Sequence, residues 1–392
     1  MTEHCKRLKV ALVYKDFAYW TGYSSVGLQV AADTTCAELR RNGVDVQVFG
    51  LQNNVDLYHV LKHNQKLASE IHDVHGFTDC VIMAPWITPL DLEALAKYFK
   101  NIQFTVQSHC NVGALHGDFR GIGNFRNYAD LAQEYRNIHI AGNAASFTKW
   151  FSLAYDVDTA LLPNMYPAIN MQEHNSATPN ILHIGAFGAL RPEKNIPSAV
   201  AAALLIQQHL QKQTYFHMNT GGEVGGKNLI ATIDQISQGI PGFTVVKHPW
   251  MDWNKFTDLV KKMDLLMNPS YTESFNLITA DGIVAGVPSV VSSAIRWAPK
   301  SWMADSDDPS DIAGVGLRLL FNKHSYKDGR DALIKHNNES VSLWKEYLYE
   351  GEVPDYHIHH EHDDDDDDDT VIQPIPWYTR IGNFFRKTNE SL

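Results

Sequence analysis

The sequence of 392 residues has few cysteines, no long apolar run and no excess of positive charge. Its four cysteines, Cys5, Cys36, Cys80 and Cys110, form no CxxC pair, which argues against a disulfide framework and against a structural zinc site. No apolar run reaches the roughly 18–20 residues that a membrane-spanning helix needs, and the N-terminal run is too short for a signal peptide. We therefore expect a cytoplasmic protein.

The charge of the chain is acidic and unevenly distributed. A formal net charge of −12 lacks the basic excess that is typical of nucleic-acid-binding domains. Much of it comes from the run Asp363 to Asp369, so the rest of the chain is nearer to neutral. The hydrophobic content of 44% is ordinary for a globular protein, and the length favours two domains.

Short β-rich apolar runs alternate with longer helical patterns in two series. The expected strands lie at 8–14, 44–50, 78–85, 102–110 and 138–143, and then at 180–188, 214–222, 243–249 and 265–271. Because continuous apolar strands separated by helices are typical of parallel sheets covered on both faces, this pattern predicts an α/β protein with two tandem Rossmann-like, doubly wound domains facing a cleft. We expect an N-terminal domain at 1–166, a linker at 167–179 and a C-terminal domain at 180–350.

The remaining residues differ in composition. Residues 351–373 are rich in His and Asp and are expected to form a solvated linker. Its histidines could instead chelate a divalent metal, but we favour the linker because no folded frame fixes the ligands. Residues 374–392 are aromatic and basic at helical spacing, which predicts a terminal helix packed on the body. The alternative is a peripheral membrane contact through 374–392.

The stretch YTESFNLITADGIVAGVPSVV (271–291) carries two acids at an unusual position. A strand precedes it, Glu273 lies in the following loop, and a helix is expected from Phe275. A helix N-terminus binds anions such as phosphate, and the two carboxylates can accept hydrogen bonds from hydroxyl groups on either side of it. A phosphate between two hydroxyl-bearing groups describes a nucleotide-sugar. The simpler alternative is that Glu273 and Asp281 are ordinary helix and surface acids.

Glu273, seven residues and Asp281, followed by GIVAGVPSVV, resemble the E-x7-E motif of the retaining GT-B glycosyltransferases of the glycosyltransferase-4-like family. HIGAFGALRPEKN (183–195) resembles the strand-and-loop signature of that family, LLPNMYP (161–167) its domain crossing, and SHC (108–110) the position of a histidine after a strand. Residues 16–50 resemble its opening glycine loop, helix and second strand. The resemblance covers most of residues 8–345 and implies an N-terminal acceptor domain and a C-terminal donor domain.

The resemblance also implies a role for each matching residue. Glu273, Lys194 and His109 would be the catalytic residues, with Lys194 stabilising the departing diphosphate. Donor binding would involve Asp281 at the ribose, the backbone of Phe275, Asn276 and Leu277, and Arg191, Gly22, Gly188 and His248. Trp20 and Tyr23 would line an acceptor site, although they could equally be local packing; His109 could be a histidine whose hydrogen bonds are satisfied within the protein.

The implied reaction moves a sugar from a nucleotide-diphosphate sugar with retention, without metal or other cofactor. The acceptor class stays open between a saccharide, a lipid-linked molecule, a protein and a modified DNA base. Two residues depart from the family pattern: Ala189 replaces its arginine, and Asp281 is one methylene shorter than its second glutamate. One alternative is a DNA-base glycosyltransferase of the same fold, which the acidic balance disfavours. The other, suggested by Ala189, is an inactive nucleotide-sugar-binding protein.

Overall fold

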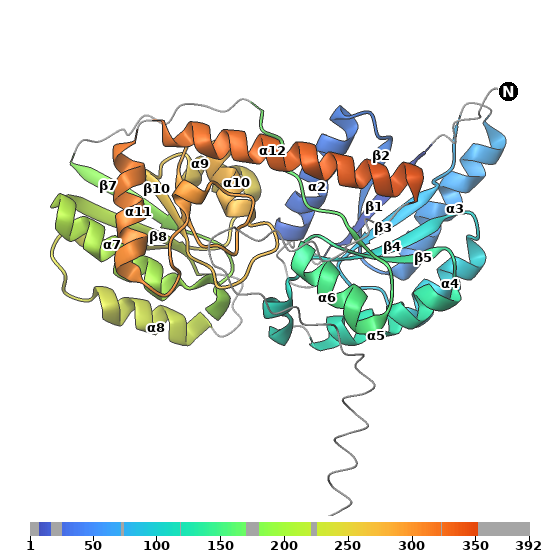
Figure 1. The fold of residues 1–392 in the computed structure, drawn as a ribbon, viewed down its shortest axis with the longest axis horizontal. Helices are drawn as coiled ribbons and strands as arrows, with labels where there is room; N and C mark the ends of the chain where they lie inside the picture. Colours follow the sequence, from blue (N-terminus) through green and yellow to red (C-terminus); the bar gives the residue numbers. More distant parts are fainter. Residues whose placement is uncertain are drawn as a thin grey trace, which may run out of the picture. The chain divides into compact units, whose positions relative to one another are not determined.

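The computed structural model describes residues 8–16, 26–71, 74–117, 119–169, 180–220, 226–322 and 324–351. Three predicted site residues, Trp20, Gly22 and Tyr23, lie outside the described residues, as do the linker from residue 352 onward and the terminal helix predicted at 374–392. The described residues form two parallel sheets with flanking helices, as the alternation of patterns predicted (Figure 1).

The N-terminal sheet has six parallel strands in the order β2-β1-β3-β4-β5-β6. Its strands are β1 Val10–Lys15, β2 Val46–Leu51, β3 Asp79–Met83, β4 Gln103–Ser108, β5 Ile138–Gly142 and β6 Thr159–Leu161. Its helices are α2 Val26–Arg41, α3 Asn54–Glu70, α4 Pro89–Tyr98, α5 Phe119–Glu134 and α6 Ala145–Tyr155, with a 3-10 turn at Val112–Gly117. Because every strand is parallel, all the loops that follow strands gather at one edge of the sheet.

The two faces of this sheet are covered differently. Helices α3 to α6 bury residues such as Leu61, Leu92 and Phe151 against one face. Helix α2 buries Ala31 and Leu39 against the other. The strands are apolar on both sides, which explains why their sequences read as continuous apolar runs.

The C-terminal sheet has five parallel strands in the order β11-β10-β7-β8-β9. Its strands are β7 Ile181–Ala186, β8 Gln213–Asn219, β9 Phe243–His248, β10 Leu265–Asn268 and β11 Ser289–Val291. Its helices are α7 Ile196–Leu210, α8 Gly226–Ser237, α9 Trp253–Val260, α10 Leu277–Val284, α11 Pro309–Phe321 and α12 Ser325–Lys345, with 3-10 turns at Pro192–Lys194 and Lys300–Trp302 and a π-helical turn, η4, at Glu346–Glu350. Its switch in strand order lies between β7 and β10, beside the loops that carry the predicted site.

Helix α12 contributes to the hydrophobic cores of both sheets, and it can be followed in Figure 1 as the long orange helix. Leu333 packs in the core of the C-terminal sheet, whereas Trp344 and Leu348 pack with β1 and α2. The indole Nε1 of Trp344 donates to the carbonyl oxygen of Pro163 at 2.9 Å. Residues 341–348, which lie within the range 180–350 expected for the C-terminal domain, thus complete the core of the N-terminal sheet through a long-range contact that local patterning does not reveal.

None of the helices in the described ranges has both the length and the apolar surface needed to cross a bilayer.

Candidate active site

The loops that follow β4, β5, β7 and β10 bring together side chains from both sheets. The Ser274 hydroxyl, after β10, donates to the carbonyl oxygen of His109, after β4, at 3.1 Å. Asn111 Nδ2 donates to the carbonyl oxygen of Glu273 at 3.3 Å. The structure therefore places His109 beside the loop that carries Glu273, although 162 residues separate Asn111 from Glu273 in the sequence.

Glu273 is the most extensively bonded side chain in this loop. Its carboxylate is 9% exposed, and Oε1 accepts from Lys194 Nζ at 2.5 Å. The same oxygen accepts from Ser270 Oγ at 2.8 Å and from Asn276 Nδ2 at 2.9 Å. Since all three bonds fall on Oε1, Oε2 accepts from none of the described residues. The described residues thus hold one carboxylate oxygen and leave the other available to a hydroxyl donor.

Lys194 ends the 3-10 turn Pro192–Lys194, which follows the loop at Gly188. Gly188 has a φ of +116°, a conformation that only glycine adopts readily, and a Cβ there would lie 3.7 Å from Lys194 Cε. The predicted trio of Gly188, Lys194 and Glu273 is therefore gathered at one place. Arg191 is exposed, and its side chain forms no ion pair within the described ranges, so its predicted role at the donor stays a prediction.

The helix after Glu273 begins later than predicted. Asn276 has a left-handed φ of 67°, its Oδ1 accepts from Thr279 N at 2.8 Å, and α10 starts at Leu277 rather than at Phe275. Phe275 is 2% exposed and stacks on Trp297 with ring centroids 5.1 Å apart. The reason is that the Asn276 side chain caps the helix, a device that apolar patterning does not show.

Asp281 lies on α10 and is 5% exposed. Its Oδ1 accepts from the Tyr166 hydroxyl and from Trp253 Nε1, the latter at 3.1 Å. Removal from water raises the pKa of this carboxyl to about 6, against the partial effect of the two donors. As at Glu273, the bonds fall on one oxygen, and Oδ2 accepts from none of the described residues. Sequence reasoning missed Tyr166 and Trp253, because neither is near Asp281 in the chain.

His109 is held in one tautomer by its neighbours. Gln107 Nε2 donates to the carbonyl oxygen of Leu162 at 2.5 Å, so Gln107 Oε1 faces the ring and lies 3.0 Å from His109 Nε2. Nε2 therefore carries the hydrogen and Nδ1 is an acceptor. Burial lowers the pKa of His109 to about 3, which keeps the ring neutral at physiological pH.

His248, at the end of β9, belongs to a row of three histidines on neighbouring strands. His248 Nε2 and His217 Nδ1 are 2.9 Å apart, and His217 Nε2 lies 2.9 Å from His183 Nδ1. Burial is the main cause that lowers the pKa of His217, to about 4, and it also lowers the pKa of His248. These contacts do not link His248 to Glu273 or Asp281, and its predicted role at the donor stays a prediction.

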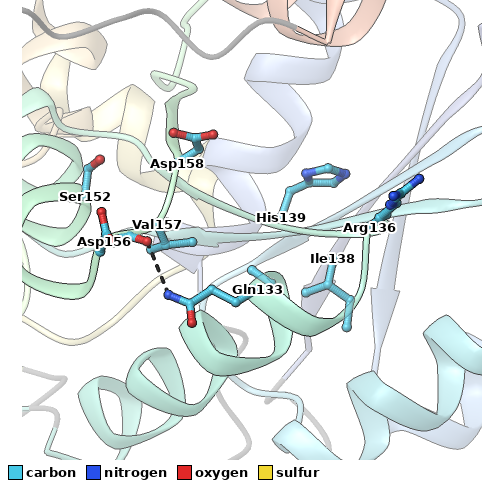
Figure 2. Close-up of a pocket in the computed structure, with 9 residues that line it drawn as sticks. Gln133, Arg136, Ile138, His139, Ser152, Asp156, Val157 and Asp158 are labelled. Atoms are coloured by element: carbon cyan, nitrogen blue, oxygen red, sulfur yellow. Dashed lines mark hydrogen bonds between the residues drawn. The ribbon is translucent and has the colours of Figure 1, made fainter.

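A hollow of about 440 Å³ lies at the opposite edge of the N-terminal sheet (Figure 2). Its lining includes Arg136, His139 and Asp158, near the starts of β5 and β6. Gln133 donates to the carbonyl oxygen of Asp156 at 3.2 Å across it. The length of β5, on the order of 15 Å, separates this hollow from His109, so it is distinct from the candidate active site.

Comparison with known proteins gives similarity of structure alone. No protein-family model matches the chain, and no curated protein is significantly similar in sequence. Sucrose-phosphate synthase from Thermosynechococcus elongatus superposes with a TM-score of 0.60 at 15% identity, over 88% of this chain and 99% of that chain. The trehalose-6-phosphate synthase OtsA gives a TM-score of 0.58 at 12% identity, over 87% and 98% of the two chains.

A mutant of TarM from S. aureus, solved in complex with UDP, gives a TM-score of 0.51 at 15% identity over 69% of this chain. The present chain spans about half of TarM, 55% of its length. These neighbours are retaining glycosyltransferases of GT-B architecture, and the fold of this chain is GT-B.

Proposed function

We propose that this protein is a retaining glycosyltransferase that transfers a sugar from a nucleotide-diphosphate sugar. The observation that carries the proposal is that Glu273 and Asp281 have the same hydrogen-bonding pattern. Glu273 lies in the loop before α10 and Asp281 lies within α10, and among the described residues each has one oxygen held by the protein and one oxygen open to a hydroxyl donor. The GT-B fold and the TarM structure solved with UDP support a nucleotide-sugar at this edge of the sheet.

The proposed roles follow from the contacts. Glu273 Oε2 accepts from a sugar hydroxyl, and Asp281 Oδ2 accepts from the ribose. As the bond between the anomeric carbon and the diphosphate oxygen breaks, Lys194 offsets the negative charge that develops on the diphosphate. The acceptor oxygen then bonds to the anomeric carbon on the face that the diphosphate leaves, and the acceptor hydroxyl passes its proton to the departing diphosphate oxygen. Gln107 and Asn143 occupy both ring nitrogens of His109, so this neutral ring would contact the sugar without adding charge. The chemistry is proposed to need no metal, and we place the protein in the cytoplasm.

A binding screen tests the proposal. Thermal shift and calorimetric titration with UDP-, GDP- and ADP-sugars should identify at least one that raises the melting temperature, because a ligand that binds only the native state stabilises it. Glu273→Gln should bind that sugar more weakly, whereas Glu339→Gln, which changes a helix acid that is 62% exposed, should bind it like the wild type. Failure of every nucleotide-sugar to bind would overturn the proposal.

A second candidate is a nucleotide-sugar-binding protein without transferase activity. Ala189 favours it, because it stands next to Gly188 where the family pattern has an arginine. It predicts donor binding with neither transfer nor slow hydrolysis of the donor. If the wild-type protein releases nucleoside diphosphate from the donor, it is an enzyme and this second candidate is wrong.

A further inference from the structure

Asn143 lies at the centre of the site and follows β5 directly. Its backbone N–H donates to the Ser108 carbonyl oxygen at 2.9 Å, and its side chain is buried, with 4% of the residue exposed. Its Nδ2 donates to Ser274 Oγ at 3.2 Å and lies 3.5 Å from His109 Nδ1. One amide group therefore touches both the histidine and the loop that carries Glu273.

The orientation of this amide is fixed by its neighbours. The single hydrogen of the Ser274 hydroxyl is already donated to the His109 carbonyl oxygen, so Ser274 Oγ can only accept. His109 Nδ1 can also only accept, because Nε2 carries the hydrogen toward Gln107. Both neighbours thus need a donor, and the NH₂ end of Asn143 must face them. The oxygen end must point elsewhere.

That oxygen, Asn143 Oδ1, is buried and has no hydrogen-bond partner in the described part of the chain. A buried acceptor left without a donor costs about 1–3 kcal/mol, so proteins rarely keep one without a use. Its neighbours are the groups proposed to surround the transferred sugar, which carries hydroxyl donors.

We propose that Asn143 determines sugar specificity by accepting, at Oδ1, a hydrogen bond from one hydroxyl group of the donor sugar. This inference rests on the proposed glycosyltransferase function. Gln107 sets the tautomer of His109, and Asn143 contacts the substrate through its oxygen while its nitrogen faces Nδ1 of the histidine. A sugar without that hydroxyl, or with it in the opposite configuration, leaves Oδ1 unpaired and binds more weakly.

The test pairs changes in the ligand with changes in the residue. The probes are UDP-glucose and its deoxy analogues at each hydroxyl, or the equivalent set for the nucleotide-sugar that the screen identifies. For the wild type, one deoxy analogue should bind about tenfold more weakly than its parent. Asn143→Leu should bind the parent about tenfold more weakly and show no additional loss with that analogue. Asn143→Ala gives a second route if the leucine variant does not fold.

Ser274→Ala is the matched control, because it removes a partner of Nδ2 and leaves Oδ1 in place. This variant should keep the discrimination against the deoxy analogue. If every deoxy analogue loses affinity by the same factor in the wild type and in the Asn143 variants, Oδ1 binds a water molecule or nothing. The inference is then wrong. Binding of no nucleotide-sugar by the wild type is a different result, which overturns the proposed function itself.

Discussion

At the scale of single residues, Asp281 shows how a shorter acid is accommodated. The Tyr166 hydroxyl, at the domain crossing, and the Trp253 indole, on α9, both donate to its Oδ1. The sequence identified this acid by its spacing from Glu273. It could not identify the donors, because they lie 115 and 28 residues away from Asp281 in the chain.

The raised pKa of Asp281 makes stability depend on pH. The folded carboxyl has a pKa of about 6 and the ordinary value is 3.8, so the folded state holds the proton more tightly and its stability falls as pH rises from about 4 to 6. Between pH 5 and pH 8 the wild type should lose about 1.4 kcal/mol of unfolding free energy from this group. The Asp281→Asn variant should not show this loss of unfolding free energy, because its side chain does not titrate. Urea unfolding of both proteins at pH 5 and pH 8 measures the difference in their unfolding free energies. If that difference were the same at both pH values, the raised pKa of Asp281 would be contradicted.

The ion pair of Lys194 and Glu273 should contribute more than the surface pairs. Glu273 is 9% exposed, so Lys194→Met leaves a nearly buried carboxylate without its cation and should cost about 1–3 kcal/mol of stability. Lys335→Met removes a partner of Glu339 that is 79% exposed and should cost less than about 1 kcal/mol. Denaturant midpoints of the two variants test this. Similar midpoints would mean that Glu273 is solvated in solution.

At the scale of elements, α12 is the helix whose packing the sequence describes least well. Its existence follows from its pattern and length, but its pattern does not say that Leu333 and Trp344 bury into different sheets. The start of α10 was missed for a related reason, since the cap at Asn276 depends on side-chain hydrogen bonds. The longer strands were predicted, because buried parallel strands are continuous apolar runs, whereas the three-residue strands β6 and β11 were missed.

Trp344 tests the part of α12 that packs with the N-terminal sheet. Its side chain is fully buried, so Trp344→Phe should leave a cavity and an unpaired Pro163 carbonyl, at a cost of about 2–4 kcal/mol. Tyr349→Phe, in the adjacent turn, changes a residue that is 52% exposed and should be nearly neutral. Calorimetric melting of both variants measures the contrast, and a neutral Trp344→Phe would show that the helix end is not part of this core.

At the scale of the whole molecule, buried histidines set the acid limit of stability. Burial lowers the pKa of His109, His139, His217, His248 and His336. In the unfolded chain these groups take up protons below about pH 6.5, whereas the folded protein resists protonation, so stability is lost as pH falls through that value.

The size of this loss exceeds the gain from Asp281. At pH 5.5 His109 and His217 should each cost about 1.4 kcal/mol, while Asp281 returns less than about 1 kcal/mol between pH 7.5 and 5.5. The urea midpoint should therefore be lower at pH 5.5 than at pH 7.5. His217→Gln should reduce the difference, and an unchanged pH dependence in that variant would contradict its neutral state in the folded protein.

The fold and the candidate site were predictable to different extents for one physical reason. Periodicity and loop motifs are local, so the two doubly wound domains and the positions of Glu273 and Lys194 were accessible from the sequence. Asn143, Tyr166 and Trp253 act through contacts between distant segments, and no local pattern marks them.

The packing of α12 also bears on the order in which the protein can fold. The Thr105 and Tyr347 hydroxyls are hydrogen-bonded at 2.6 Å across 242 residues of sequence, and Val341, Trp344 and Leu348 close the α2 face of the first sheet. During synthesis, the N-terminal strands emerge first, but their core waits for residues made after the entire second sheet. Such long loop closures slow folding, so the first domain to be translated should be the last to become fully stable.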